Sequence, residues 1–306
     1  MIGCIIQARV NSTRLPKKVL KNIDDKKKVL EFIINQVKYS KKIDKIVIAT
    51  TTKNDDDIIT MISKKNNCDY FRGSEKDVLD RYYYCAKKFN FDSIVRITSD
   101  CPLIDPQIID NVIEKFESKN YDYVTNTFPR TFPKGLDVEI FSFTTLEQMW
   151  REAKLPSERE HVTQFILNHN KFRIGNIEYN NNLSNLRWTL DQKEDFEFLS
   201  NIIKRIQTRP ILINHVLKIL SDEPELSKIN EGIDPNEGIK KSKKEDIDFL
   251  KKKNKIYINN YKKFLIFSIL RKLSFIILNW LISNDVEASR LFELGNLTCF
   301  SIIICL

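Results

Sequence analysis

Short apolar runs alternate with segments of helical periodicity along most of this chain, and this alternation restricts the possible folds more than any other feature. Buried strands are predicted at three apolar runs, 2–6, 45–50 and 93–98. Helices are predicted at 29–39, 57–65, 76–89 and 106–117. The order strand, helix, strand is typical of βαβ units. The sequence therefore predicts an α/β fold with a mostly parallel, Rossmann-like sheet and flanking helices.

The alternation continues beyond residue 120 in shorter elements. Further strands are predicted at 121–124, 137–143 and 172–178. Further helices are predicted at 144–153, at 158–168 and from Asp191 to about Arg205. Near Asp246 the composition changes through a run of lysines into an apolar tail. We therefore expect one domain over residues 1–245, followed by a lysine-rich linker and an apolar helical tail over 246–306.

The charge and the cysteines of the chain restrict its expected partners and cellular location. The formal net charge is +9, but the lysines are spread along the chain and do not interleave with aromatic residues on one face, so we expect no nucleic-acid partner. A lysine-rich solvated surface is the simplest explanation, and attraction to phosphates or to an anionic membrane is the alternative. The six cysteines form no CxxC pair, and the N-terminus lacks the apolar stretch of a secretory signal. These features predict a cytoplasmic protein with reduced thiols.

The loop after the first predicted strand has the composition of an anion-binding site. Residues 7–18 read QARVNSTRLPKK and combine two arginines, two lysines and hydroxyl side chains. Arginine binds phosphate oxygens through two parallel hydrogen bonds, and lysine neutralises them as a point charge. The alternative is an ordinary basic surface loop. No GxxxxGK[ST] or GxGxxG motif occurs, so a P-loop enzyme or a dinucleotide-binding dehydrogenase is disfavoured.

Two aspartates are candidates for a metal site. Asp100 follows the strand predicted at 93–98, at the carboxyl edge of the sheet, and Asp191 ends a later extended run. Mg²⁺ prefers one or two carboxylates, with water and phosphate oxygens completing its coordination. The structural alternatives are that Asp100 caps the helix beginning near Pro106, and that Asp191 caps the next helix together with Glu194. Both interpretations stay open at this point.

In combination, these motifs resemble those of the cytidylyltransferase family that includes CMP-Kdo and CMP-sialate synthetases. The similarity covers about residues 1–245, and it looks closest to the branch of spore-coat polysaccharide biosynthesis proteins. It begins in the loop, at residues 6–20. The other matching segments are RGSEKDVLDR at 72–81, 96–106, 121–139 with its GLDVE run at 135–139, EHVT at 160–163 and RWTLD at 187–191.

The resemblance implies a GT-A-like fold and an enzyme that joins the nucleoside monophosphate of an NTP, expected to be CTP, to a sugar or sugar acid with release of pyrophosphate. It implies Mg²⁺ as the cofactor, held by Asp100 and Asp191. The implied catalytic residues are Arg9, Lys18 and Asp100. The implied nucleotide contacts are Gln7, Ala8, Arg9, Ser12, Arg14, Lys18, Arg72, Ser74 and Asp100. The implied sugar contacts are Asn126, Asp137 and Glu139, whereas the resemblance gives no role to His161.

Two positions of the loop depart from the family pattern, which commonly has glycine where this chain has Asn11 and Lys17. Asparagine tolerates a left-handed backbone, so the change at Asn11 is expected to be mild. Lys17 is expected to restrict the turn and thereby to alter the loop geometry.

The apolar run at 264–282 contains Arg271 and Lys272 near its centre. Two central charges cost about as much free energy as the apolar residues gain on insertion, so crossing a bilayer is close to break-even. We expect a helix that lies on a membrane surface or packs against a partner, such as a second copy in a homodimer. A disordered extension and a true membrane span are the alternatives.

Two other functions are compatible with parts of the sequence. A glycosyltransferase of the same fold would consume a nucleotide sugar, but Ser99-Asp100-Cys101 stands where such enzymes use a DxD motif. A nucleotide-binding or nucleic-acid-binding module without catalytic activity would leave the two aspartates, Asp100 and Asp191, unexplained. Nucleotidyl transfer explains the loop and both aspartates.

Overall fold

The computed structural model, which describes residues 1–234 and 237–283, is built around a seven-stranded sheet in the order β3-β2-β1-β4-β6-β5-β7. Four strands pair with one another in parallel, namely β1 (Ile2–Gln7), β2 (Lys45–Thr51), β3 (Asp69–Gly73) and β4 (Ser93–Thr98). Three short strands complete the sheet, β5 (Tyr123–Thr125), β6 (Glu139–Ser142) and β7 (Ile174–Asn176). β6 is antiparallel to β4 and β5, whereas β7 is parallel to β5. The expected α/β fold with a mostly parallel sheet is confirmed.

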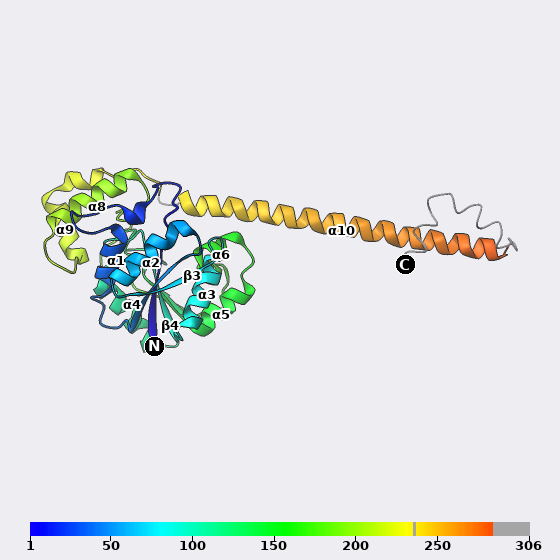
Figure 1. Cartoon of the computed structure of the whole chain (residues 1–306), viewed down its shortest axis with the longest axis horizontal. Coiled ribbons are helices and arrows are strands. Elements are labelled where there is room, and N and C mark those ends of the chain that lie inside the picture. The colour runs from blue at the N-terminus through cyan, green and yellow to red at the C-terminus, as the bar shows by residue number, and fades with distance from the viewer. Residues whose placement is uncertain (235–236, 284–306) are drawn as a thin grey trace. The chain divides into compact units, whose positions relative to one another are not determined.

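Helices cover both faces of the sheet because its strands bury side chains on both sides. In β1, Cys4 and Ile6 belong to one apolar cluster and Ile5 belongs to the other. The first face is covered by α1 (Val29–Val37), α2 (Asp57–Lys65), α4 (Pro106–Ser118), α8 (Lys193–Arg205) and α9 (Ile213–Asp222). The opposite face is covered by α3 (Val78–Lys88), α5 (Phe143–Glu152) and α7 (Gln164–Asn168), as Figure 1 shows for α3 and α5. Short 3-10 helices lie at Lys18–Leu20, Asn54–Asp56 and Pro224–Lys228.

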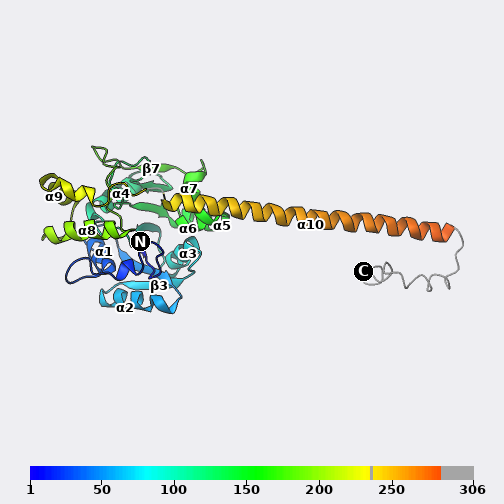
Figure 2. The same cartoon turned by 90° about the horizontal axis from the view of Figure 1, so that it is seen from above.

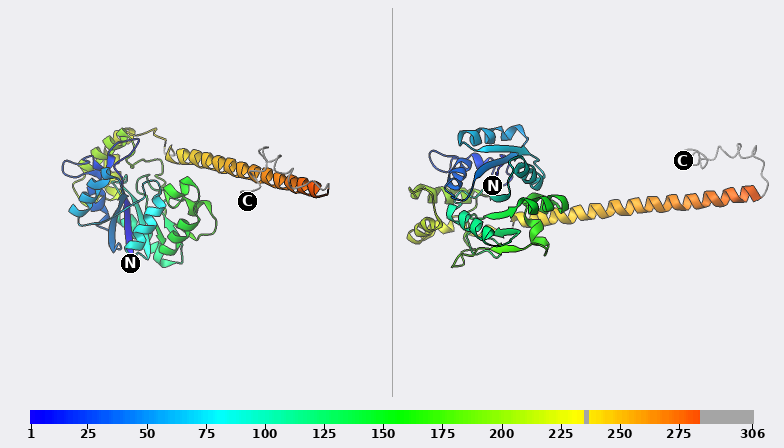
Figure 3. Two further views of the ribbon diagram at one scale, coloured as in Figure 1. Left: turned by 45° about the vertical axis from the view of Figure 1, so that its right-hand side comes forward. Right: turned by 90° about the horizontal axis from the view of Figure 1, so that it is seen from below.

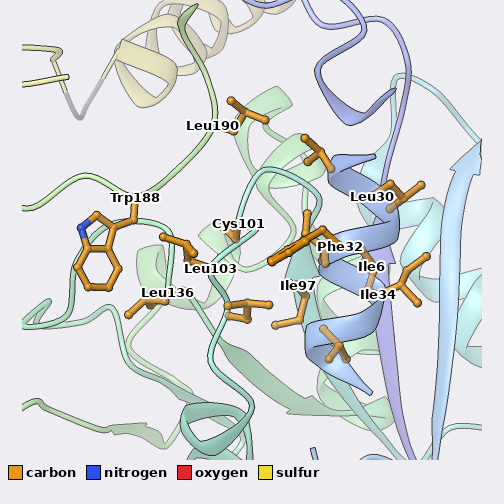
Figure 4. Close-up of a cluster of buried hydrophobic side chains, with 14 of the residues drawn as sticks. Ile6, Leu30, Phe32, Ile34, Ile97, Cys101, Leu103, Leu136, Trp188 and Leu190 are labelled. Atoms are coloured by element: carbon orange, nitrogen blue, oxygen red, sulfur yellow. The ribbon is translucent and has the colours of Figure 1, made fainter. Parts of the chain in front are cut away.

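The apolar cluster of the first face anchors the two segments that carry the candidate metal ligands. Cys101 follows Asp100 and Leu190 precedes Asp191, and both of these apolar side chains are buried in that cluster. Figure 4 shows them among the same group of buried side chains as Ile97 of β4. Core packing therefore fixes the backbone beside each aspartate.

Three local predictions need correction. The helix predicted at 158–168 is two helices, α6 (Pro156–His161) and α7, because Val162 between them has a φ of 62°. β3 was not predicted, since its exposed edge position leaves it without an apolar run. The helix expected to open at Asp191 begins at Lys193, and the side chain of Asp195 accepts the backbone N–H groups of Asp191 and Gln192.

The C-terminal part of the described chain is one long helix, α10 (Glu237–Ser283), which Figures 2 and 3 show without interruption. The segment from 239 to 283 has no glycine or proline and is rich in lysine, isoleucine and leucine, so little opposes helix formation. The stretch expected to be a lysine-rich linker is thus helical. The chain divides into two compact units after Asp246, within this helix. The rest of the expected tail, 284–306, lies outside the described residues.

A search of the described helices for a segment both long enough and apolar enough to cross a membrane finds no such segment.

Candidate active site

The carboxyl ends of β1 and β4 lie side by side at one edge of the sheet, because the two strands pair in parallel with Gln7 opposite Thr98. The backbone N–H of Ser99 donates to the carbonyl of Gln7 at 3.2 Å, which joins the starts of the two loops that follow. The basic loop after β1 and the turn that contains Asp100 are therefore neighbours. This is the edge at which ligands bind in doubly wound sheets.

Lys18 links this edge to the segment that ends in Asp191. Its ammonium group donates to Oδ2 of Asp100 at 3.0 Å, to Oδ1 of Asp191 at 3.0 Å and to the carbonyl of Leu190 at 2.8 Å. Arg14 donates from Nη2 to the same oxygen of Asp191 at 2.7 Å. One ammonium thus bridges two carboxylates that are far apart in the sequence. The predicted convergence of Arg14, Lys18, Asp100 and Asp191 is present in the structure.

The bridge is largely shielded from water, since the side chains of Lys18 and Asp191 are 12% and 7% exposed. Burial alone would lower the pKa of Lys18, but the charges of Asp100 and Asp191 outweigh burial and raise it. Burial alone would raise the pKa of Asp100, but the Lys18 charge and a 2.5 Å hydrogen bond from Thr98 hold it well below its usual range. Lys18 and Asp100 are therefore both charged at neutral pH.

Neither aspartate serves as the helix cap that the sequence also allowed. Asp105 caps α4, because its side chain accepts the backbone N–H of Gln107 at 2.8 Å. Asp195, rather than the pair of Asp191 and Glu194, supplies the carboxylate at the start of α8. The carboxylates of Asp100 and Asp191 instead form ion pairs with cationic side chains of the basic loop.

The backbone of the basic loop needs a left-handed residue at Lys17, where φ is 55° and ψ is 27°. This is a conformation that glycine adopts without cost and that lysine adopts only with strain. Among the described residues, Asn11 is not one of those with positive φ, so its tolerance of that conformation is not used. Lys17 therefore adopts the backbone conformation typical of glycine, and its effect on the geometry of the loop stays a prediction.

A cavity of about 410 Å³ opens at this edge, a size that suits a small-molecule ligand. The loop and strand-end residues predicted to contact the nucleotide line it, namely Gln7, Ala8, Arg9, Ser12, Arg14, Lys18 and Asp100. Asp191 reaches the same place through its bonds to Lys18 and Arg14.

Two other predicted nucleotide contacts lie outside the lining of this cavity. Arg72 donates to the carbonyls of Thr51 and Lys53 at 2.9 and 2.7 Å and to Asp57 at 2.6 Å, so its guanidinium is occupied within the fold. The hydroxyl of Ser74 accepts the backbone N–H of Asp77 at 3.0 Å and forms the turn before α3. The structure brings neither side chain to the basic loop.

The three predicted sugar contacts are also bound to other parts of the fold and do not line the cavity. Asn126 is fully buried and uses both ends of its amide to hold the backbone of Leu136 and Val138. Asp137 forms two parallel hydrogen bonds with Arg130 at 2.6 and 2.7 Å. These two side chains organise the loop before β6.

Glu139 is the centre of a buried polar network behind the cavity. Its carboxylate forms an ion pair with Arg96 and accepts hydrogen bonds from Tyr123 at 2.6 Å and Thr163 at 2.5 Å. Glu139 is only 7% exposed, so it has no free face for a sugar. Its partner Arg96, in contrast, lines the cavity.

Further residues of the cavity wall received no individual role from the sequence, although many of them lie within the matching segments. The additional lining residues are Thr13, Val78, Arg81, Arg96, Thr98, Ser99, Glu160, His161, Glu237, Gly238, Lys241 and Ser242. The last four belong to the first turns of α10, a segment whose lysine-rich composition concealed its contacts. Nε2 of His161 lies 2.7 Å from the hydroxyl of Ser242, and burial lowers the pKa of this histidine.

The carboxylates of Asp100 and Asp191 are the only predicted metal ligands at this edge of the described chain. Within residues 1–234 and 237–283, no group of three or more His, Cys, Asp or Glu side chains is arranged to hold a metal ion. Asp100 and Asp191 supply two carboxylates, which is the number that Mg²⁺ commonly uses when phosphate oxygens and water complete its coordination. The ammonium of Lys18 forms ion pairs with both carboxylates, so the two side chains are directed toward one positive charge.

Comparisons with known proteins agree with this arrangement. The family model described as Cytidylyltransferase matches residues 3–259. The spore coat polysaccharide biosynthesis protein SpsF of Bacillus subtilis is 32% identical over 230 residues, which are 72% of this chain and 94% of that protein. A cytidylyltransferase structure from Leptospira borgpetersenii superposes with a TM-score of 0.73 at 35% identity, and the match covers 76% of this chain and 98% of that one. A 3-deoxy-manno-octulosonate cytidylyltransferase of Chloroherpeton thalassium is 32% identical over 114 residues, 37% of this chain and 44% of that protein.

Proposed function

Because the chain belongs to the cytidylyltransferase family, we propose that it transfers the CMP part of CTP to a sugar acid and releases pyrophosphate, in the synthesis of a surface polysaccharide or glycan. The observation that carries this proposal is the bridge of Lys18 between Asp100 and Asp191 in the wall of a cavity lined by the basic loop. The name of the relative from Chloroherpeton thalassium supports a sugar acid as the acceptor.

In the proposed reaction, a hydroxyl oxygen of the acceptor forms a bond to the α-phosphorus of CTP. The bond from that phosphorus to the bridging oxygen of pyrophosphate breaks, and the hydroxyl proton passes to the solvent. Negative charge grows on the departing pyrophosphate, where Arg9, Arg14 and Lys18 supply positive charge. Positioning and electrostatic stabilisation account for most of the rate in reactions of this type.

Magnesium is the proposed cofactor. Asp100 and Asp191 would hold it, and when bound it would neutralise phosphate charge. The ammonium of Lys18 holds the two carboxylates close together through its hydrogen bonds to both. Arg14 shares Asp191 with Lys18, so the same carboxylate also orients the basic loop.

We assign the fold to the GT-A-like class and the catalytic domain to residues 1–245. The carboxylate of Asp100 at the end of β4 supports the first assignment. The second is supported by the Leptospira structure, almost all of which corresponds to about three quarters of this chain. The buried free thiols of Cys4, Cys68, Cys85 and Cys101 support a cytoplasmic location.

The proposal is tested by pyrophosphate release from the full chain. CTP, UTP, ATP and GTP are each combined with 3-deoxy-manno-octulosonate, other sugar acids and neutral sugars, with and without MgCl₂. We expect release with CTP and a sugar acid only in the presence of the divalent ion. A chain that releases pyrophosphate with no combination, but transfers sugar from a nucleotide sugar, would be a glycosyltransferase, the function that the family match disfavours.

A further inference from the structure

Arg81 is a buried guanidinium that faces the cavity without a carboxylate partner. It lies in the first turn of α3, is 2% exposed and lines the same cavity as Lys18. Its Nη1 donates to the carbonyl of Ser74 at 3.0 Å, while its Nε is buried and bonds to nothing. No ion pair of Arg81 occurs among the residues that the structure describes. A buried cation without a counter-ion is costly, because it loses its hydration and gains no opposite charge.

The other buried cations of the cavity are neutralised by the protein itself. Lys18 is paired with Asp100 and Asp191, and Arg96 is paired with Glu139. Arg9, which is exposed and close enough to disfavour the charge of Arg81, also has no ion pair within the described part of the chain. Arg9 and Arg81 are therefore cations of the cavity wall that form no ion pair among the described residues.

The side chain of Arg81 packs against Gly73. A Cβ atom at Gly73 would lie 2.8 Å from the ring of Phe71 and 3.1 Å from Cγ of Arg81, so a larger residue would require these side chains to shift. The nearby carboxylate of Asp77 is not available to it, because Asp77 caps α3 through the N–H of Asp80 and binds Arg159 at 2.5 Å. The helix thus presents its first turn and an unpaired guanidinium to the cavity.

We infer that Arg81, with Arg9 and the N-terminus of α3, forms an oxyanion subsite that a negatively charged group of a substrate completes. The inference rests on the proposed function for the identity of the substrates, and it gives a specific role to the last residue of the matching segment 72–81. Two neighbouring guanidinium groups suit a group with more than one negative charge, so we assign the subsite to the pyrophosphate end of the nucleotide. The carboxylate of a sugar acid has the same chemistry and is distinguished by the experiment.

The test measures the binding of inorganic pyrophosphate and of CTP to the full chain by titration calorimetry in MgCl₂. Arg81→Gln should weaken pyrophosphate binding by about tenfold or more, because it removes charge-assisted hydrogen bonds. Gly73→Ala should also weaken it by displacing Arg81 with the net charge unchanged. Arg151→Gln, on the exposed surface of α5, is the matched control and should bind as the wild type does. Circular dichroism and Tm report whether each variant is folded.

The outcomes separate the sources of the anion. If Arg81→Gln binds pyrophosphate normally but raises the KM of the sugar acid about tenfold at saturating CTP, the subsite holds the acceptor carboxylate. If neither quantity changes in a folded Arg81→Gln or Gly73→Ala variant, Arg81 is structural and the subsite is overturned. Failure of the proposed function would appear differently, as a wild-type chain that binds pyrophosphate through Arg81 but transfers no CMP. A wild type that does not bind pyrophosphate at all would overturn the phosphate assignment directly.

Discussion

Lys18 donates a 3.0 Å hydrogen bond to Asp100, and both side chains line the cavity, so the basic loop is joined there to the turn that follows β4. Asp100→Asn keeps a similar shape, but Lys18 and Thr98 bond different oxygens of Asp100, so the single amide oxygen can replace only one of the two acceptors. We expect this variant to fold but to lose about 100-fold or more in kcat, because the negative charge that would hold magnesium is gone. Pyrophosphate release and Tm measure the two effects. Asp222→Asn, at the exposed end of α9, is the control. Near-normal turnover in folded Asp100→Asn would disprove the metal assignment.

The lowered pKa of Asp100 predicts how this contact contributes to stability as the pH changes. A carboxyl with a lower pKa in the folded chain stabilises the fold above its unfolded pKa of about 4, and that contribution is lost as the pH falls toward the folded value. The difference in unfolding free energy between wild type and Asp100→Asn should therefore be constant from about pH 5 to 7 and should shrink below about pH 4. Urea denaturation at several pH values measures it. A difference that grows on acidification would contradict the ion pair.

Charge reversal should separate Lys18 from an ordinary surface lysine. Lys18→Glu places a third negative charge beside Asp100 and Asp191, so we expect kcat/KM for CTP to fall by about 100-fold or more. Lys41→Glu changes the net charge by the same amount at an exposed position outside the cavity and should alter kcat/KM less than about threefold. Similar losses in both variants would reduce the basic loop to a general attraction for anions.

The left-handed conformation of Lys17 predicts an unusual effect of glycine. Lys17→Gly removes a steric cost of about 1 to 2 kcal/mol, which the greater freedom of glycine in the unfolded chain offsets by about 0.5 to 1 kcal/mol. We expect the unfolding free energy to stay the same or to rise by up to about 1.5 kcal/mol. Lys21→Gly, where φ is −68°, should instead destabilise the fold. Chemical denaturation compares the two variants. Marked destabilisation by Lys17→Gly would show that the lysine side chain itself supports the loop.

The sequence allowed the sheet and the charged loop to be predicted for a physical reason. Strand ends in a parallel sheet meet at one edge, so Lys18, Asp100 and the elements that carry them are brought together by topology alone. The sequence does not show in which direction each side chain of a motif points. Glu139 belongs to a recognisable run, but its carboxylate faces Arg96 and Tyr123 in the interior, and no spacing rule indicates this. The wall formed by Ser242 was missed because a lysine-rich segment has the composition of a solvated surface.

The contacts of α10 predict where the chain can be shortened. Asp246 accepts hydrogen bonds from the N–H and hydroxyl of Ser157 at 2.9 and 2.6 Å, and Ser242 bonds His161, so the first turns of α10 belong to the cavity wall. A chain that ends at Asp246 keeps these contacts and should retain kcat/KM within a few-fold of the full chain. A chain that ends at Gly232 lacks the wall, and we expect its KM values to rise about tenfold or more. Equal activity of both shortened chains would show that the wall does not take part in binding.

A comparison of the full chain with the chain that ends at Asp246 tests the expected contact of the tail with a membrane surface. Residues 251–253 are lysines, and Ile266, Phe267, Ile269 and Leu270 are exposed on α10. Cationic and apolar side chains together favour an anionic lipid surface, where each lysine contributes about 1 kcal/mol and apolar side chains enter the interface. The full chain should sediment with phosphatidylglycerol vesicles at low salt, whereas the chain ending at Asp246 should stay in the supernatant. Equal sedimentation of both would remove the tail from membrane binding. Loss of turnover in a folded chain ending at Asp246 would show that residues beyond it help to build the active site, and the domain boundary proposed at residue 245 would be wrong.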